Sequence, residues 1–427
     1  MLSRTTIPVE ILDLRHFSSV DLRPLLERES ELWMRRLAWD YGPSAEMILR
    51  YLDSKILPGY AAIDRGRVFG YCFFVYEGSK GVIGDLFVAT ANGYSTAAQI
   101  SQIEHQLLTH VIDTLQSSPG VHRIEAQLLM HNAGAAAAPF LREGFSQYQR
   151  LFMTLPVTAE QAPIREMPAD FEIRRWREQD YQAAAGLITT AYRNHVDSEI
   201  NDQYRTLSGS LRFLNNIVRF PGCGTFDPEA SFVAVHKPSK ASVGMILTSR
   251  VKEDVGHVTQ VCLMPEYRSH GIGEALIAAT RANLRKRDFS MLSLTVTEAN
   301  KRAVALYIRL GFRVQHIFDA FVWEGGKSGN RVFGKLGTCT PNCSAVLPET
   351  TSFTRLSDLP FQKPHHPARE NHSTDEQAKA VRSIAEHLFR RVLLGDAEHD
   401  GGAYSEQQCG AEVRELEGHF FFPIAMW

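Results

Sequence analysis

The sequence predicts an α/β fold in which one order of strands and helices occurs twice. Short apolar strands alternate with amphipathic helical stretches in both halves of the chain. Each half also ends in a Gly-Phe pair, Gly144–Phe145 and Gly311–Phe312, with an asparagine upstream at Asn132 and Asn300. Self-similarity at this scale indicates two copies of one domain.

In the first copy, turn chemistry and periodicity predict the elements. Residues 59–88 contain three strands, separated by Asp-Arg-Gly-Arg and by Glu-Gly-Ser-Lys-Gly, which are both typical of tight turns. Apolar residues at helical spacing predict a long helix over 96–115, and a strand follows at 122–130. Residues 132–155 close this copy.

The second copy repeats these elements in the same order. A helix is predicted from Ile272, and residues 300–323 close the copy. The strands are predicted at 231–237, 242–251, 256–264 and 289–297.

These elements divide the chain into three parts. The first copy is predicted at 1–160 and the second at 170–330, because the segment between them is rich in proline and charge. Residues 338–427 are predicted to be a linker or disordered tail, since most of this part is rich in Pro, Ser and Thr. One helix is expected there, over 375–395.

The composition favours an ordinary soluble globular protein. Of 427 residues, 44% are hydrophobic and 22% are charged, and the formal net charge is -2. This balance indicates no nucleic-acid partner and no acidic membrane surface. The sequence has no long apolar run and no signal-peptide core at its N-terminus, so we expect a cytoplasmic protein without a membrane span.

The cysteines favour a reducing compartment. Six of them are scattered without the pattern of a secreted disulfide scaffold. A zinc site formed by Cys339, Cys343, His365 and His366 is an alternative use of the tail. The histidine pair lacks a typical separation from the cysteine pair, so no metal is expected.

Residues 261–276 predict a strand, a glycine turn and a helix. Pro265 interrupts the strand, and Arg268, Gly271 and Gly273 precede the apolar residues of the helix. Such a turn directs free backbone N–H groups and the positive end of the helix dipole at one point, where a phosphate can bind. The alternative is that the glycines serve only the tight turn.

Two motifs of this copy resemble those of the GCN5-related N-acetyltransferases, the GNAT family. The first, Arg/Gln-x-x-Gly-x-Gly/Ala, is matched by Arg268, Gly271 and Gly273. The second is an asparagine followed by alanine, Leu-Tyr and Gly-Phe, and it is matched over 300–312. The resemblance is strong over 230–323, weaker over 170–230 and topological only over 1–157.

The resemblance implies a mixed, splayed sheet that holds acetyl-CoA between two diverging strands. Leu263 matches the position whose backbone groups pair with the pantetheine arm, and Asn300 matches the asparagine that contacts this arm. Tyr307 matches the general acid that protonates the departing thiolate. The pyrophosphate loop of the family matches Arg268, Ser269, His270, Gly271, Ile272 and Gly273.

Two of these residues also have a purely structural explanation. Asn300 is placed to cap the helix that follows it. Tyr307 lies in an apolar stripe with Leu306 and Leu310, where a core tyrosine with a satisfied hydroxyl fits equally well.

The acceptor amine must lose a proton, and the sequence does not single out the base. Glu253, His257, Gln260 through a water, and Glu298 are candidates. Glu298, near the end of its strand and two residues before Asn300, is the predicted base. A strand histidine such as His257 is more often structural than catalytic.

The first copy lacks most of these features. The loop after its third strand contains no Arg-x-x-Gly-x-Gly, and Phe140 stands in the position of Tyr307 without a proton to donate. Asn132 is retained. We therefore predict a degenerate copy that supports the second copy or shapes its acceptor cleft.

The predicted function is acetyl transfer from acetyl-CoA to a primary amine of a small molecule or peptide by direct attack. The alternative is a non-catalytic acyl-CoA-binding sensor or regulatory module. The chain is expected to act as a monomer or homodimer. The acceptor is not identified by the residues: Tyr192, Asp197 and Glu199 fit an acceptor entrance, and they fit a plain surface equally well.

Overall fold

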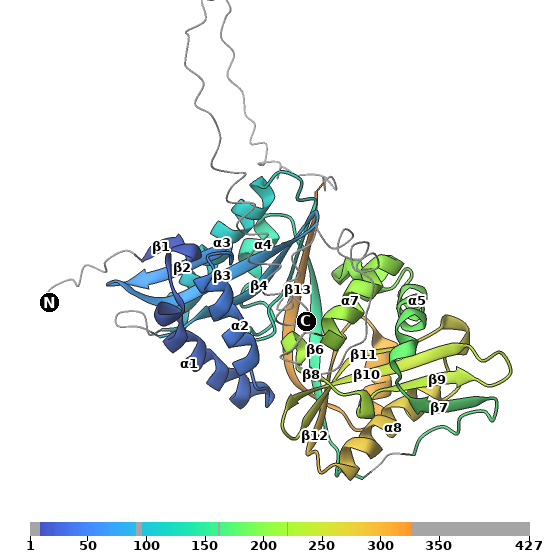
Figure 1. The fold of residues 1–427 in the computed structure, drawn as a ribbon. Helices are drawn as coiled ribbons and strands as arrows, with labels where there is room; N and C mark the ends of the chain where they lie inside the picture. Colours follow the sequence, from blue (N-terminus) through green and yellow to red (C-terminus); the bar gives the residue numbers. More distant parts are fainter. Residues whose placement is uncertain (1–8, 91–95, 161–162, 220, 326–427) are drawn as a thin grey trace, which may run out of the picture. The chain divides into compact units, whose positions relative to one another are not determined.

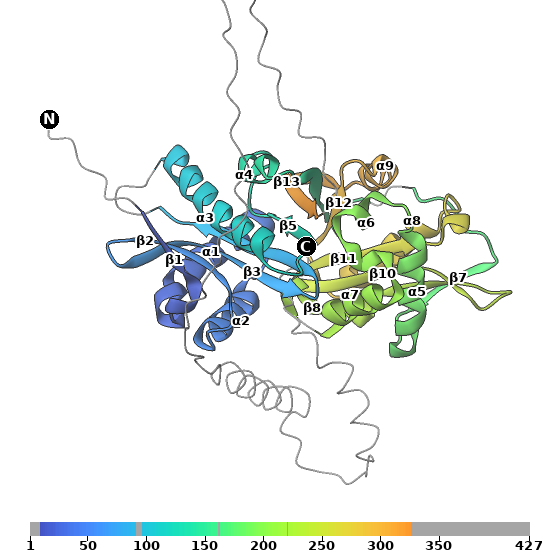
Figure 2. The same cartoon turned by 90° about the horizontal axis from the view of Figure 1, so that it is seen from above.

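The computed structural model describes residues 9–90, 96–160, 163–219 and 221–325. These residues form one mixed β-sheet with helices on both faces (Figures 1 and 2). The strand order is β1-β2-β3-β4-β5-β13-β6-β12-β11-β10-β9-β7, and β8 pairs with β10 outside this path. The predicted α/β fold with a mixed sheet is confirmed. The predicted tail helix and the alternative zinc site fall outside the described residues.

The first copy contributes the strands and helices up to β6. Its strands are β1 (Glu10–Asp13), β2 (Gly59–Asp64), β3 (Arg67–Glu77), β4 (Lys80–Val88), β5 (Arg123–Gln127) and β6 (Ser146–Pro156). Its α-helices are α1 (Ser19–Leu37), α2 (Gly42–Asp53), α3 (Ala97–Ser117) and α4 (Ala137–Arg142), and the 3-10 helix η1 covers Leu14–His16.

The second copy begins at β7. Its strands are β7 (Phe171–Arg175), β8 (Thr225–Phe226), β9 (Phe232–His236), β10 (Ser242–Lys252), β11 (Val255–Leu263), β12 (Met291–Thr297) and β13 (Arg313–Glu324). Its α-helices are α5 (Tyr181–Ala191), α6 (Val196–Ile200), α7 (Leu207–Arg219), α8 (Ile272–Lys286) and α9 (Lys301–Arg309). The 3-10 helices are η2 (Glu178–Asp180), η3 (Asp202–Arg205), η4 (Pro221–Cys223), η5 (Pro228–Ala230) and η6 (Pro265–Tyr267).

The predicted elements are present with small shifts at their ends. The strands of 59–88 are β2, β3 and β4, and the helix expected over 96–115 is α3. The helices α1 and α2 were not predicted. In α1 the side chains of Leu22, Leu25 and Leu26 are buried, which is the spacing of an amphipathic helix.

Helices cover both faces of the sheet in each copy. α1 and α2 pack on one face of β2 and β3, whereas α3 packs on the other (Figure 2). In the second copy α8 covers one face, and α5 and α7 cover the opposite one. Within the residues described, no helix is both long and apolar enough to span a bilayer.

Two central parallel strands separate in each copy. β4 pairs with β5 as far as Ile83, and β11 pairs with β12 as far as Val258. The next residue of β4 is Gly84, and it has no partner in the antiparallel pairing with β3. The next residue of β11 is Thr259, which has no partner in the antiparallel pairing with β10. Each strand therefore has a β-bulge at this point. Beyond the bulge the two parallel strands no longer pair, so each copy has an opening in its sheet.

The last strand of each copy lies in the sheet of the other copy. β6 pairs with β12 of the second copy, and β13 pairs with β5 of the first copy. β6 and β13 pair with each other between them (Figure 1). The two copies are therefore joined through an exchange of their closing strands.

Candidate active site

The candidate site lies in the second copy, where β11 and β12 separate. β11 ends at Leu263, and its chain continues through η6 and a loop into α8. β12 ends at Thr297, and its chain continues through Asn300 into α9. Both motifs found in the sequence therefore follow the open ends of two neighbouring strands.

The glycine loop has the backbone of an anion-binding turn. Ser269 has φ 70° and Gly271 has φ 78°, so two residues of the loop adopt the left-handed conformation. Gly271 is the N-cap of α8, and no side chain caps this helix. The backbone N–H groups of the first helical turn are thus left for another acceptor.

The two glycines keep the loop close to its neighbours. A Cβ at Gly271 would lie 2.9 Å from the carbonyl oxygen of Arg165, and its positive φ already disfavours other residues. A Cβ at Gly273 would lie 3.3 Å from a methyl group of Leu263. Close packing therefore explains glycine at both positions, together with access to the backbone. Ile272 is buried between them, and His270 is exposed.

Three arginines surround this loop. Arg268 donates to the carbonyl oxygens of Ala191 at 2.7 Å and of Leu263 at 3.4 Å, so it ties the loop to α5 and to the end of β11. Arg165 donates to the carbonyl oxygen of Ser269 at 2.5 Å, and Arg302 donates to the Ser269 hydroxyl. The loop is thus electropositive, as phosphate binding requires.

One carboxylate lies in the first turn of α8, and it is neutralised. Glu274 accepts two hydrogen bonds from Arg309, at 2.6 and 3.1 Å, and one from the backbone N–H of Arg165 at 2.8 Å. The hydrogen bond from Arg309 lowers the pKa of Glu274 most strongly. The negative charge therefore does not oppose an anion at the start of the helix.

Tyr307 is buried on α9, with 6% of its surface exposed. Burial raises the pKa of Tyr307 well above that of a free tyrosine, and the carboxylate of Asp197 raises it further. Tyr307 therefore carries its proton at neutral pH, as a general acid must. Its ring also packs near Phe312 at 5.7 Å between centroids, so the residue belongs to the core as well.

Asn300 joins the end of β12 to a polar cluster formed by His195, Asp197 and Thr297. Its side-chain oxygen accepts from the backbone N–H of Ala303 at 3.2 Å, which caps α9, and its side-chain nitrogen lies 3.4 Å from Nε2 of His195. Nδ1 of His195 accepts from the backbone N–H of Asp197 at 3.1 Å. The Asp197 carboxylate accepts a hydrogen bond from the Thr297 hydroxyl.

Tyr192 closes the β11 side of the opening. Its hydroxyl donates to the side-chain oxygen of Gln260 at 2.7 Å, and its ring stacks on Tyr204 at 4.5 Å. Of the three residues expected at an acceptor entrance, Tyr192 and Asp197 belong to this cluster. Glu199 is exposed and lies 3.6 Å from Arg205.

The candidate bases lie in different surroundings. His257 is buried in the paired part of β11 between Trp39 and Phe152, and burial lowers its pKa to about 3. It is a neutral core histidine rather than a residue of the opening. Glu298 pairs with Lys301 at 2.8 Å on the surface. Glu253 is exposed in the turn between β10 and β11.

The second copy matches a known family model. Residues 197–312 match the model described as "Acetyltransferase (GNAT) family", a range that includes the glycine loop, Asn300 and Tyr307. Residues 197–312 therefore form a GNAT-family domain. The match lies wholly within the second copy, where both sequence motifs were found.

Relatives of the chain are named acetyltransferases. Mycothiol acetyltransferase of Thermobispora bispora is 30% identical over 222 residues, which are 48% of this chain and 66% of the relative. Mycothiol acetyltransferase of Thermobifida fusca is 36% identical over 98 residues, 21% of this chain and 30% of the relative. The alignments thus cover only part of these proteins.

A solved structure shows the same fold. The GCN5-related N-acetyltransferase from Sphaerobacter thermophilus superposes with a TM-score of 0.50 at 17% identity. The superposition covers 75% of this chain and 97% of that chain, so it extends over both copies. At this identity the similarity is one of fold.

In the first copy two buried carboxyl groups occupy the corresponding opening, beside a small cavity lined by Tyr41, Gly84 and Asp85. The pairing of the strands aligns Asp85 with Gln260, and Asp85 is buried and accepts from the Tyr41 hydroxyl at 2.6 Å. The carboxyl of Glu29 is also buried there, and it accepts from Tyr71 at 2.7 Å. Burial raises the pKa of both carboxyl groups, and their mutual repulsion raises that of Glu29 further.

Four residues of the GNAT site were not predicted from the sequence. Arg302 lies within the second motif, two residues after Asn300, and this position was a usable signal for a cation beside the loop. Arg165, His195 and Thr297 gave no comparable signal, because only the folded chain brings them to the loop and to the strand ends.

Proposed function

We propose that the chain is an N-acetyltransferase that transfers an acetyl group from acetyl-CoA to a primary amine of a small molecule or peptide. The observation that carries this proposal is the uncapped start of α8, at Gly271, beside the opening between β11 and β12. The names of the relatives support acetyl transfer. We place the activity in the cytoplasm, as the composition favours.

The loop and the strand ends fit the cofactor. Its pyrophosphate would accept hydrogen bonds from the backbone N–H groups at the start of α8, with Arg268, Arg302 and Arg165 near it. The backbone of this loop is formed by Ser269, His270, Gly271, Ile272 and Gly273. The pantetheine arm would run along the end of β11 at Leu263, within reach of Asn300.

Transfer then needs one proton donor and one proton acceptor. The amine nitrogen attacks the thioester carbonyl, the new N–C bond forms, and the C–S bond breaks. Tyr307 protonates the departing thiolate, because it carries its proton at neutral pH. Glu298 is the base predicted from the sequence, and His195 with Asp197 is a second candidate because it lies beside Asn300.

A calorimetric titration of acetyl-CoA into the intact protein tests this proposal. We expect one site per chain, which Gly271→Val abolishes, because the substitution forces an unfavourable φ and a contact with Arg165. Gly144→Val is the matched control: Gly144 has φ 80° and lies in the first copy. The control should retain the cofactor site.

Other outcomes of the titration separate the alternatives. Two sites per chain would mean that the first copy also binds the cofactor. Binding without transfer to any primary amine would instead indicate the non-catalytic acyl-CoA sensor. No binding by the wild-type protein would contradict both functions.

A further inference from the structure

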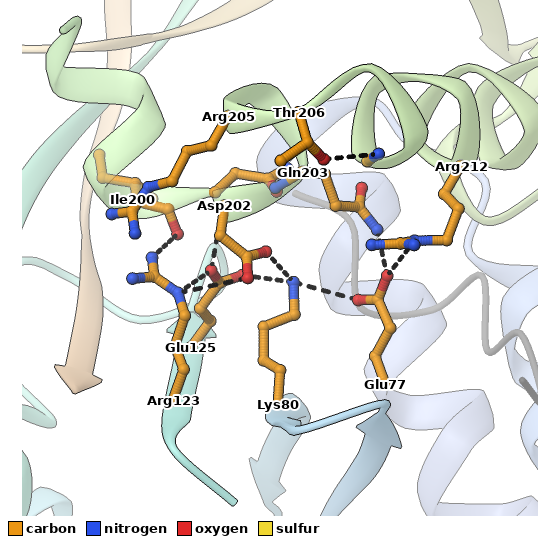
Figure 3. A network of polar contacts seen from close by, with 12 residues as sticks. Glu77, Lys80, Arg123, Glu125, Ile200, Asp202, Gln203, Arg205, Thr206 and Arg212 are labelled. Carbon is orange, nitrogen blue, oxygen red and sulfur yellow. Dashed lines mark hydrogen bonds and ion pairs between the residues drawn. The ribbon is translucent and has the colours of Figure 1, made fainter. Parts of the chain in front are cut away.

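Charged residues of the first copy hold one segment of the second copy (Figure 3). Lys80, at the start of β4, donates to the carboxylate of Asp202 at 2.7 Å, and it lies 3.1 Å from both Glu77 and Glu125. Glu125 on β5 also accepts from the backbone N–H of Asp202 at 3.1 Å. The first copy thus binds both the side chain and the backbone of Asp202.

Arg123 holds the same segment through its backbone. The guanidinium group donates to the carbonyl oxygens of Glu199 at 2.5 Å and of Ile200 at 3.4 Å, where α6 ends. These last carbonyls of a helix have no partner within the helix, so an arginine satisfies them well. Arg123 also pairs with Glu125 and with Glu324 of β13, both at 2.5 Å.

The centre of this network is buried. Lys80 is 5% exposed, and Arg123 and Glu125 are each 6% exposed. Burial alone would lower the pKa of Lys80, but the carboxylates of Glu125, Glu77 and Asp202 hold it above its ordinary value. Burial alone would raise the pKa of Asp202, and Lys80 and Arg123 outweigh this effect and lower it. Removing Lys80 would take the shared cation away from Glu77, Glu125 and Asp202, so the network favours one position of the segment.

The held segment, residues 195–205, carries side chains that lie at the opening between β11 and β12. His195 and Asp197 contact Asn300 and Thr297, at the end of β12. Tyr204 stacks on Tyr192. The segment cannot position these residues alone, because α6 has five residues and η3 has four, and such short helices are unstable in isolation.

We propose that the first copy positions the acceptor side of the second-copy cleft, with Lys80 and Arg123 acting through residues 195–205 on Asp197 and His195. Neither Lys80 nor Arg123 touches the cofactor loop, so both are positioning residues. The inference rests on the proposed acetyl transfer, because that reaction defines an acceptor. In this proposal the first copy affects acceptor binding in the second copy, although it binds no ligand itself.

Asp202→Asn tests the proposal with little change in shape. It removes the charge that Lys80 holds, while the backbone hydrogen bond to Glu125 stays. We expect the KM for the acceptor to rise about tenfold, since hydrogen bonds between charged groups are among the stronger ones. The Kd of acetyl-CoA should stay within about twofold, because α8 and its loop do not contact the network.

Asp254→Asn is the matched control. Asp254 pairs with Lys252 at 2.7 Å, and its side chain is 36% exposed. Asp202 pairs with Lys80 at the same distance, and its side chain is 33% exposed. It lies in the turn between β10 and β11, away from residues 195–205. It should leave both the acceptor KM and the cofactor Kd unchanged, and Asp202→Glu should recover part of the wild-type KM.

Amide hydrogen exchange gives a second measurement that does not depend on activity. In Asp202→Asn, and more strongly in Lys80→Met, the amides of 196–205 should exchange faster while those of α8 do not change. Faster exchange with an unchanged acceptor KM would overturn the proposal, and so would unchanged exchange. If the wild-type protein transfers no acetyl group, the proposed function fails, and the exchange data still decide whether the first copy holds the segment.

Discussion

The helices α3 and α8 begin at equivalent places in the two copies, and their first turns differ. Thr96 caps α3: its hydroxyl accepts from the backbone N–H of Gln99, whose side chain accepts in return from the backbone N–H of Thr96. α8 begins instead at Gly271, without a side-chain cap. In α3 a side chain of the chain itself accepts from one of these N–H groups, and in α8 no side chain does.

The same scaffold thus serves two purposes through a few side chains. A capping box stabilises a helix by satisfying its first donors internally. A glycine cap gives up this stabilisation and leaves the donors accessible. The opening between the parallel strands shows the same contrast. Asp85 and Glu29 lie in it in the first copy, whereas Gln260 accepts a hydrogen bond from Tyr192 in the second.

The largest effect is expected from substituting the aromatic residue four positions before each Gly-Phe pair, which is Tyr307 in the second copy and Phe140 in the first. Tyr307→Phe should lower kcat at least about 100-fold, because the departing thiolate loses its proton donor. The Kd of acetyl-CoA should stay within about twofold, as calorimetry would measure. An unchanged kcat with a good acceptor would contradict the role of Tyr307.

The reciprocal change, Phe140→Tyr, serves as the control. Phe140 is fully buried and stacks on Phe321 at 4.1 Å between centroids. A hydroxyl there would be buried and should destabilise the fold by roughly 1–3 kcal/mol. The first copy should gain no activity, because its helix start remains capped by Thr96.

A smaller effect, on stability, is expected where the parallel strands pair. In the second copy His257 of β11 lies opposite Ser293, and in the first copy Val82 of β4 lies opposite Glu125. Burial lowers the pKa of His257 to about 3, below the ordinary 6.5, so the unfolded chain binds the proton first. The contribution of His257 to the free energy of unfolding is therefore complete above pH 6.5, and it is lost as pH falls toward 3.

The variant His257→Val isolates this contribution. Between pH 7 and pH 5 the free energy of unfolding of the wild-type protein should fall by about 2 kcal/mol more than that of the variant. Denaturant unfolding at several pH values measures the difference. His16→Gln, at an exposed histidine, controls for the loss of one imidazole, and parallel curves for wild type and His257→Val would refute the prediction.

The smallest effect is expected at the two asparagines. Asn300 caps α9, so Asn300→Ala should lower the free energy of unfolding by about 1 kcal/mol. Asn132 accepts a hydrogen bond from Arg36 at 3.3 Å instead, and Asn132→Ala should change stability by less. If Asn300→Asp retains stability and weakens acetyl-CoA binding, Asn300 contacts the cofactor in addition to capping the helix.

The sequence was sufficient for the features that are local in the chain. Each strand and helix, and the glycine loop after β11, lies within one short stretch, so spacing predicts it. The motif from Asn300 to Phe312 is also local, and the resemblance to the GNAT family identifies it. α1 also has a clear helical spacing at Leu22, Leu25 and Leu26, and its absence from the prediction was an omission rather than a limit of the sequence.

The remaining features depend on contacts between distant residues. Arg165 reaches Ser269, and Lys80 reaches Asp202, across more than 100 positions in each case. The periodicity of a segment tells which of its faces is buried, and it does not tell which partner covers that face. The hydrogen bonds among His195, Asp197, Thr297 and Asn300 could not be predicted for the same reason.

The exchanged closing strands set an order for the synthesis of this protein. β5 is complete at Gln127, but its neighbour β13 ends only at Glu324, so nearly 200 further residues must leave the ribosome before that pair forms. The edge of β5 stays open during this time and needs protection from other strands. A gene fragment that encodes either copy alone would lack the strand that the other copy contributes to its sheet.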